Sequence, residues 1–210
     1  MRNPEKKQPA EMKPIAEVVE SSTHRVVAQC TQRKDRPPIA LPPPYGSLVL
    51  IEGEPETVAV VCSITTTGYD PNRRATALEQ GSYEETYLEY PELVELHVTQ
   101  IEAIPIGHGT AGEYVQGTPP TPPPLHASVR RFPPRHWPRF LDKLHFLRLL
   151  GDAAGTASRE LFVQTILSLL AGAPDEPTRQ EWLLRIGREL ARILKGDYDQ
   201  LKSILERIQD

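Results

Sequence analysis

The sequence predicts an α+β protein with more than one domain, in which a small N-terminal β barrel with a short helical insertion precedes a C-terminal all-α helical bundle. Twenty of its 22 prolines lie before Phe140. Because proline removes a backbone donor and disrupts helix interiors, the first two thirds should consist of strands, turns and extended linkers. The last third is free to be helical, and its apolar residues recur with helical spacing.

We expect four segments along the chain. Residues 1–13 should form a disordered tail, residues 14–117 the barrel, residues 118–137 a proline-rich linker and residues 138–210 the bundle. Inside the linker, Thr118 to Pro124 has the composition of a stiff polyproline II strut. A PxxP ligand for an aromatic groove is the alternative interpretation of that stretch.

The composition fits a globular protein. Its 210 residues are 39% hydrophobic and 25% charged. The longest weakly polar run is too short to cross a bilayer, and the first residues do not form a secretory signal or transit peptide, so we expect a cytoplasmic protein without membrane contact. Cys30 and Cys62 are the only cysteines, which excludes a disulfide scaffold and a multi-cysteine zinc site.

Five segments have the β-branched residues and flanking turn residues of strands. The segment Thr57 to Thr66 places Val58, Val60, Cys62 and Ile64 on one face, as in a half-buried strand. Several short strands joined by long loops favour a barrel or sandwich over a βαβ sheet. The expected strands are Ile15 to Glu20, His24 to Gln32, Gly46 to Ile51, Thr57 to Thr66 and Val98 to Ile106.

A helical insertion interrupts the strands. Ser82 and Glu85 have the spacing of a capping box, and Tyr87 follows at helical spacing. Residues 83–97 should therefore form two short helices that bridge strands. The preceding residues 68–72 have the composition of a turn, with Arg73 and Arg74 exposed behind it.

Residues 14–108 contain five motifs that point to a known barrel. They are Gly46-Ser47-Leu48-Val49, Thr66-Thr67-Gly68, Asp70-Pro71-Asn72-Arg73-Arg74, Tyr87-x-x-Tyr90-Pro91-Glu92-Leu93 and Ile104-Pro105-Ile106-Gly107-His108. Together they resemble the HAS-barrel, the N-terminal barrel shared by HerA-type DNA translocases and the large subunits of rotary ATP synthases. The resemblance covers about half of the chain and implies a barrel that associates with other barrels, either into a ring or onto a motor's own collar.

The chain departs from that family in one respect. In those proteins the barrel precedes a RecA-like motor with the phosphate loop GxxxxGK[ST], and this sequence contains no Gly-Lys pair. The resemblance therefore implies a collar without its motor. The candidate partner-binding residues are Asp70, Arg73, Arg74, Tyr87, Tyr90, Arg130, Arg131 and Trp137.

No motif predicts a catalytic, cofactor-binding or metal-binding site. Residues 107–112 match the dinucleotide fingerprint GxGxxG, but residues 113–120 cannot supply the helix that binds a pyrophosphate, so we expect a flexible glycine turn. The six histidines lack metal-ligand spacing, and no GxSxG elbow is present. The carboxylates at 84, 85, 89 and 92 are typical of a solvated helix face.

Charge is distributed unevenly. Residues 14–125 contain six Lys or Arg against fifteen Asp or Glu, and no Lys or Arg lies between Ala75 and Val129. An acidic barrel would repel a phosphate backbone. Residues 130–139 are the concentrated basic and aromatic segment, which could contact nucleic acid by stacking and phosphate binding. The other interpretation is that this segment neutralises the barrel's acidic surface.

Four amphipathic stretches predict the helical bundle. They are Pro138 to Leu150, Ser158 to Ala171, a helix capped by Thr178 with Glu181 and ended by Gly196, and a last helix capped by Asp197 with Gln200. Phe146, Leu149 and Leu194 widen the apolar stripes. We therefore expect the bundle to pack against the barrel or against another chain.

These observations favour a non-catalytic interaction or assembly module, an accessory partner of a HerA-type translocase, with a protein partner or self-association. The alternative is a nucleic-acid-binding protein that uses residues 130–139. An enzyme with a site assembled from the acidic helix and His97 is a third hypothesis, disfavoured because the sequence holds no catalytic constellation.

Overall fold

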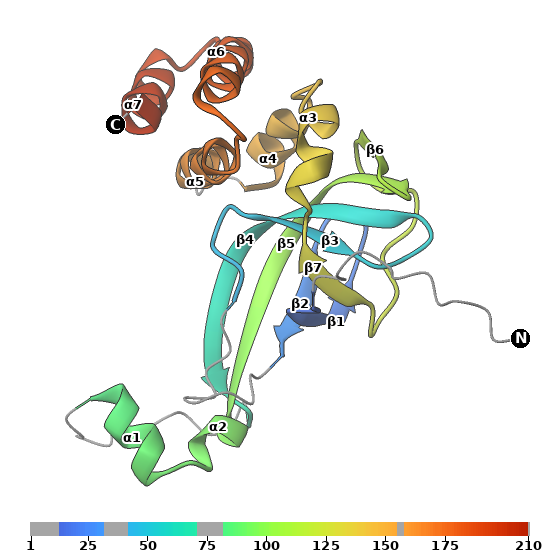
Figure 1. Cartoon of the computed structure of the whole chain (residues 1–210), viewed down its shortest axis with the longest axis vertical. Helices are drawn as coiled ribbons and strands as arrows, with labels where there is room; N and C mark the ends of the chain where they lie inside the picture. The colour runs from blue at the N-terminus through green and yellow to red at the C-terminus, as the bar shows by residue number, and fades with distance from the viewer. Residues whose placement is uncertain (1–12, 32–41, 71–81, 155–157, 210) are drawn as a thin grey trace, which may run out of the picture.

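The computed structural model describes residues 13–31, 42–70, 82–154 and 158–209. The predicted tail lies, apart from Lys13, outside these residues. The fold is α+β, as the sequence predicts, and it is built on a closed antiparallel barrel of six strands (Figure 1).

The ring of the barrel has the strand order β2-β1-β7-β3-β4-β5, and pairing of β2 with β5 closes it. A further strand, β6 (Glu113–Gln116), pairs with β5 outside the ring. The five strands expected from the sequence are all present, with shifted ends. The ring strands are β1 (Ala16–Ser21), β2 (Val26–Cys30), β3 (Leu48–Ile51), β4 (Glu56–Gly68), β5 (His97–Thr110) and β7 (Ser128–Arg131).

Small apolar side chains fill the barrel, because few side chains fit inside so narrow a ring. Ala28, Ala59 and Ala103 lie in this interior cluster, together with valines and Ile101. The first half of β4 is buried on both faces, from Thr57 to Val61. The prediction that only one face of this strand is buried is therefore wrong for these residues, because Val58 and Val60 face apolar side chains of the helices outside the barrel.

The glycine-rich residues 107–112 form part of a hairpin. Ala111 and Gly112 have φ angles of 53° and 93°, and they join β5 directly to β6. Positive φ at both central residues is the geometry of a two-residue hairpin turn that suits the strand twist. Strand β6 follows the turn at Glu113, where a dinucleotide-binding motif would require a helix. The predicted flexible turn leaving the barrel is instead a paired hairpin.

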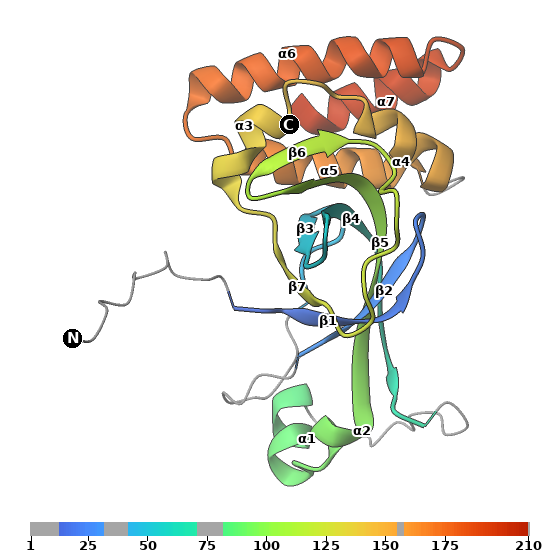
Figure 2. The ribbon, with the colours of Figure 1, turned by 90° about the vertical axis from the view of Figure 1, so that its right-hand side faces the viewer.

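The C-terminal helices cover the outer face of the barrel (Figure 2). Leu48, Leu50 and Ile106 of the barrel share one apolar cluster with Phe146 and Leu147, which are fully buried. The expectation that the helices pack against the barrel is confirmed. The elements are η1 (Pro134–His136), α3 (Trp137–Phe140), α4 (Phe146–Ala154), α5 (Ser158–Ala171), α6 (Glu176–Ile193) and α7 (Tyr198–Gln209).

Close contacts join the barrel to these helices and the helices to one another. Gly46 has a φ of 79°, and a Cβ atom there would lie 2.6 Å from the backbone of Gln164 in α5. At Gly172, after α5, a Cβ would fall on the indole of Trp137. Two glycines therefore permit approaches that side chains would prevent.

The sequence-based boundaries need correction in the second half of the chain. Residues 128–131 of the predicted linker form β7, the strand that completes the ring between β1 and β3. The helix expected from Pro138 to Leu150 is two helices, because helical backbone ends at Phe140 and resumes at Phe146.

The ends of the last two helices test the capping predictions. The N-cap of α6 is Asp175, whose side chain accepts a hydrogen bond from the Thr178 backbone, so the box predicted at Thr178 is wrong. Ile193 is the last residue of α6 and Leu194 its C-cap, so Gly196 lies one residue beyond the C′ position, where the sequence predicts it. Asp197 caps α7 as predicted, by accepting a hydrogen bond of 2.9 Å from the Gln200 backbone. Within the described residues, no helix combines the length and the apolar character needed to cross a bilayer.

Candidate functional site

Strands β4 and β5 continue beyond β3 as an arm, which we define as residues 63–70 and 82–99; at its base, residues 100–102 of β5 still pair with β2. Pairing of β3 with β4 ends at Val60, whereas pairing of β4 with β5 continues to Gly68 and His97. A register shift between Val61 and Ser63 marks the exit from the barrel. Such a bulge bends a strand and increases its twist, and it therefore directs the arm away from the barrel axis.

Two short helices close the tip of the arm, α1 (Tyr83–Glu89) and α2 (Leu93–Leu96). The predicted capping box is present, because the Ser82 hydroxyl accepts from the Glu85 backbone and the Glu85 carboxylate accepts from the Ser82 backbone. A hydrogen bond of 2.9 Å joins the Tyr87 Oη to the His97 Nδ1. The two helices are therefore tied to the start of β5.

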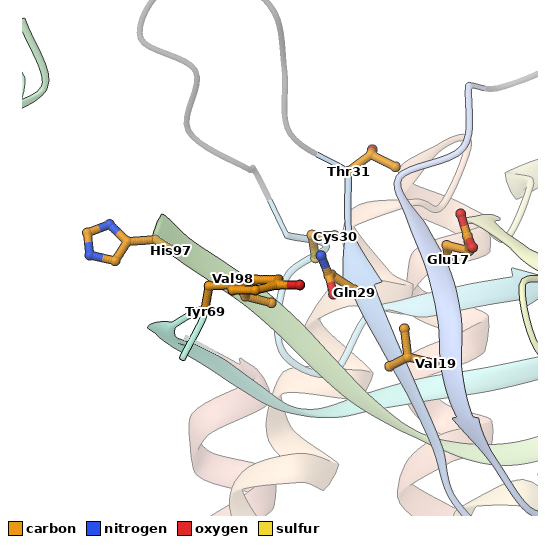
Figure 3. Close-up of a pocket in the computed structure, with 8 residues that line it drawn as sticks. All are labelled: Glu17, Val19, Gln29, Cys30, Thr31, Tyr69, His97 and Val98. Atoms are coloured by element: carbon orange, nitrogen blue, oxygen red, sulfur yellow. The ribbon is translucent and has the colours of Figure 1, made fainter. Parts of the chain in front are cut away.

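A cavity of about 500 Å³ lies between the arm and the outer side of the β1–β2 hairpin (Figure 3). The Tyr69 side chain extends across it toward Gln29, and the His97 ring turns away from the other lining residues. Tyr69 is 72% exposed. The cavity is lined by Glu17, Val19, Gln29, Cys30, Thr31, Tyr69, His97 and Val98.

The chemistry of this cavity suits binding by polar and apolar contacts. Burial raises the pKa of the Cys30 thiol to about 11, so the thiol is protonated at neutral pH and is a poor nucleophile. Glu17 lies 2.6 Å from the Nδ1 of His126. In the part of the chain that the structure describes, no three His, Cys, Asp or Glu side chains are placed to hold a metal ion.

The structure separates the predicted partner-binding residues into two groups. Asp70, Tyr87 and Tyr90 lie on the arm, where Asp70 is exposed and both tyrosines are half-buried. Arg73 and Arg74 lie outside the described residues. The remaining three residues, Arg130, Arg131 and Trp137, lie where β7 leads into α3, and Figure 1 shows α1 and α3 at opposite ends of the molecule.

The basic and aromatic segment makes contacts within the chain. Trp137 is 8% exposed, and its Nε1 donates to the carbonyl oxygen of Phe132. Arg139 forms an ion pair with Glu113 of β6. Arg131 is exposed, and Arg130 is half-buried with an Nε that has no hydrogen-bond partner among the described residues. The aromatic rings that would stack on bases are therefore packed inside the molecule.

Neither the cavity nor the overhang of β4 was predicted from the sequence. Tyr69 was assigned to a turn, and Glu17 and Gln29 carry no motif. One available signal was strand length, because the strands predicted at 57–66 and 98–106 are longer than the one at 46–51. Long neighbours of a short strand must extend past it.

No protein-family model matches this chain, and no curated protein matches it.

Proposed function

We propose that this protein is a non-catalytic interaction and assembly module that works by binding other macromolecules. The observation that carries the proposal is the arm, a paired extension that adds little to the buried core and exposes Ile64, Tyr69 and Leu88. Large apolar side chains exposed on a projecting element are typical of contact surfaces.

The finer part of the proposal rests on the resemblance to the HAS-barrel. In that interpretation the barrel forms a collar without a motor, and the chain is an accessory partner of a HerA-type translocase in the cytoplasm. The helices from Trp137 onward act as an all-α bundle that stiffens one end of the collar, and their packing on the outer face of β3, β4 and β5 is consistent with this role.

Size-exclusion chromatography with light scattering tests this proposal, with the protein alone and mixed with a cognate HerA-type motor. We expect a ring-sized assembly or a complex with the motor. A strict monomer that does not bind the motor would contradict the proposal. A matched control is Leu184→Ala, a change at an exposed leucine on α6, which should leave assembly unchanged.

Nucleic-acid binding through residues 130–139 is the alternative function. Exposure of Arg131 and Arg135 supports it, whereas burial of Phe132 and Trp137 removes the stacking surfaces. A gel shift with single-stranded and double-stranded DNA at low salt separates the two functions. Binding that weakens steeply with salt and is lost in the Arg131→Ala/Arg135→Ala double variant would favour the alternative.

A further inference from the structure

No strand among the described residues pairs with the outer edge of β4 along the arm. Through Val61, this edge bonds to the chain around β3, because the Val61 N–H donates to the Ser47 carbonyl and the Val61 carbonyl accepts from the Gly46 N–H. From Ser63 to Gly68, β4 pairs with β5 alone among the described residues. The pairing is regular over this stretch, so the edge presents backbone donors and acceptors at the spacing of a strand.

This edge lacks the usual protection against pairing. Proteins guard open edges with charged side chains, proline or bulges. The sequence Ser63-Ile64-Thr65-Thr66-Thr67-Gly68 contains no charge and no proline, and the bulge lies before it. Residues 64–67 are exposed and β-branched. The sequence therefore favours an additional strand on this edge.

Acidic side chains lie at the tip of the arm. Figure 1 shows α1 at the end of the arm, beyond the end of β4. Glu89 and Glu92 are exposed, and neither forms an ion pair with any described residue. Glu89 ends α1, where a carboxylate opposes the helix dipole. Its charge therefore does not stabilise the helix that carries it.

We propose that the open edge of β4, residues 63–68, binds an extended, Lys- or Arg-bearing segment of a partner protein, which adds to the arm as a further strand. The partner's backbone completes the hydrogen bonds of the edge, and its basic side chains compensate Glu89 and Glu92. This inference rests on the proposed interaction function and names the partner's chemistry. A second copy of β4 is a less suitable occupant because the strand contains no Lys or Arg. A nucleic acid is less suitable because it lacks the alternating amide groups that pair with a strand edge.

Amide hydrogen exchange of the full chain, measured by mass spectrometry, tests the proposal with two synthetic peptides. Both peptides have a sequence of alternating Thr and Val. They differ only at the charged positions, where one peptide carries Lys and the other carries Glu. Main-chain bonds supply most of the affinity in strand addition, so a generic sequence is a suitable probe. At a tenfold excess over the dissociation constant, the Lys peptide should slow exchange about tenfold at the residue 63–68 amides that point away from β5.

Three results would overturn the inference: equal protection by the Glu peptide, no protection on β4, or protection that rises with protein concentration without peptide. The last result would identify a second copy as the occupant. Assembly with a motor through the barrel would survive any of these results. The failure of this inference is therefore distinguishable from failure of the proposed function.

Variants separate the edge from the acidic tip. Glu89→Gln/Glu92→Gln should weaken binding of the Lys peptide about three- to tenfold, the effect of two exposed ion pairs. The control Glu54→Gln/Asp152→Asn removes the same charge elsewhere and should leave binding unchanged. Thr65→Lys, at an exposed position, should weaken binding of the Lys peptide more than the double Gln variant does. Circular dichroism should show that the fold of this variant is unchanged. Equal binding by all three variants would contradict the proposal.

Discussion

The barrel with its helices and the arm share the strands β4 and β5 but depend on different interactions. In the barrel, residues 57–61 of β4 are buried on both faces, between the interior cluster and the helices. In the arm, residues 64–67 of the same strand are exposed. Burial therefore specifies the barrel, whereas backbone pairing and caps maintain the arm. The difference leaves the arm's side chains available for binding.

The largest effect should come from Phe146, which is fully buried where α4 meets the barrel. Phe146→Ala should lower the free energy of unfolding by about 3–5 kcal/mol, because the barrel and the helices would both lose contacts. Chemical denaturation followed by circular dichroism measures the change. Leu88→Ala on the arm, where the side chain is 74% exposed, is the control and should shift stability by less than about 0.5 kcal/mol. Similar losses in both variants would remove the distinction between the regions.

A second test places a methyl group at the junction of barrel and helices. Gly46→Ala should cost about 2–4 kcal/mol, because alanine disfavours positive φ and its Cβ would contact the α5 backbone. The thermal unfolding midpoint reports the loss. Gly117 also has a positive φ but nothing lies within 4 Å of its Cβ position, so Gly117→Ala should cost less. Equal losses would mean that backbone strain alone is responsible.

The third prediction concerns the arm alone. Ser82→Ala removes the N-cap of α1 and should destabilise that helix by about 1 kcal/mol. Hydrogen exchange should accelerate in residues 85–89, while the global unfolding midpoint stays unchanged because the arm contributes little to the core. A fall in global stability of comparable size would show that the arm and the barrel unfold together.

The smallest effect should come from Glu160. Hydrogen bonds from Arg207, and then from Gln164, lower the pKa of Glu160 from 4.5 to about 2. A lowered folded-state pKa stabilises the protein above the unfolded pKa near 4.5, and this contribution is lost as the pH falls toward 2. Both partners are about half exposed, so screening keeps the effect small. Glu160→Gln should be slightly less stable than the parent at pH 7 in urea titrations, and the difference should vanish near pH 2.

The sequence predicted the parts of the fold that carry a local signal. The helix over Ser158 to Ala171 has the predicted ends, and the capping box at Ser82 is present. Strand β7 was missed because its four residues include two arginines and follow a proline-rich stretch. Its identity depends on hydrogen bonds to β1 and β3, which are distant in sequence. Non-local pairing of this kind leaves no periodic pattern in a short segment.

The candidate site was predictable only in part. Tyr87 and Tyr90 were chosen from the resemblance, and the structure places both on the arm. The open edge of β4 arises because β3 is short, which is a property of a pair of strands rather than of any residue. The burial of Trp137 likewise depends on Gly172, 35 positions later in the printed sequence, because only glycine leaves room for the indole there.

The placement of the two tryptophans has a spectroscopic consequence. Trp137 and Trp182 are both buried in the helices that cover the barrel, while the arm carries Tyr69, Tyr87 and Tyr90. Indole emission therefore reports on the helical end of the molecule, and phenol emission includes the opposite end. A ligand that changes the tyrosine signal while the tryptophan spectrum stays constant would be located optically, before any coordinates of the complex exist.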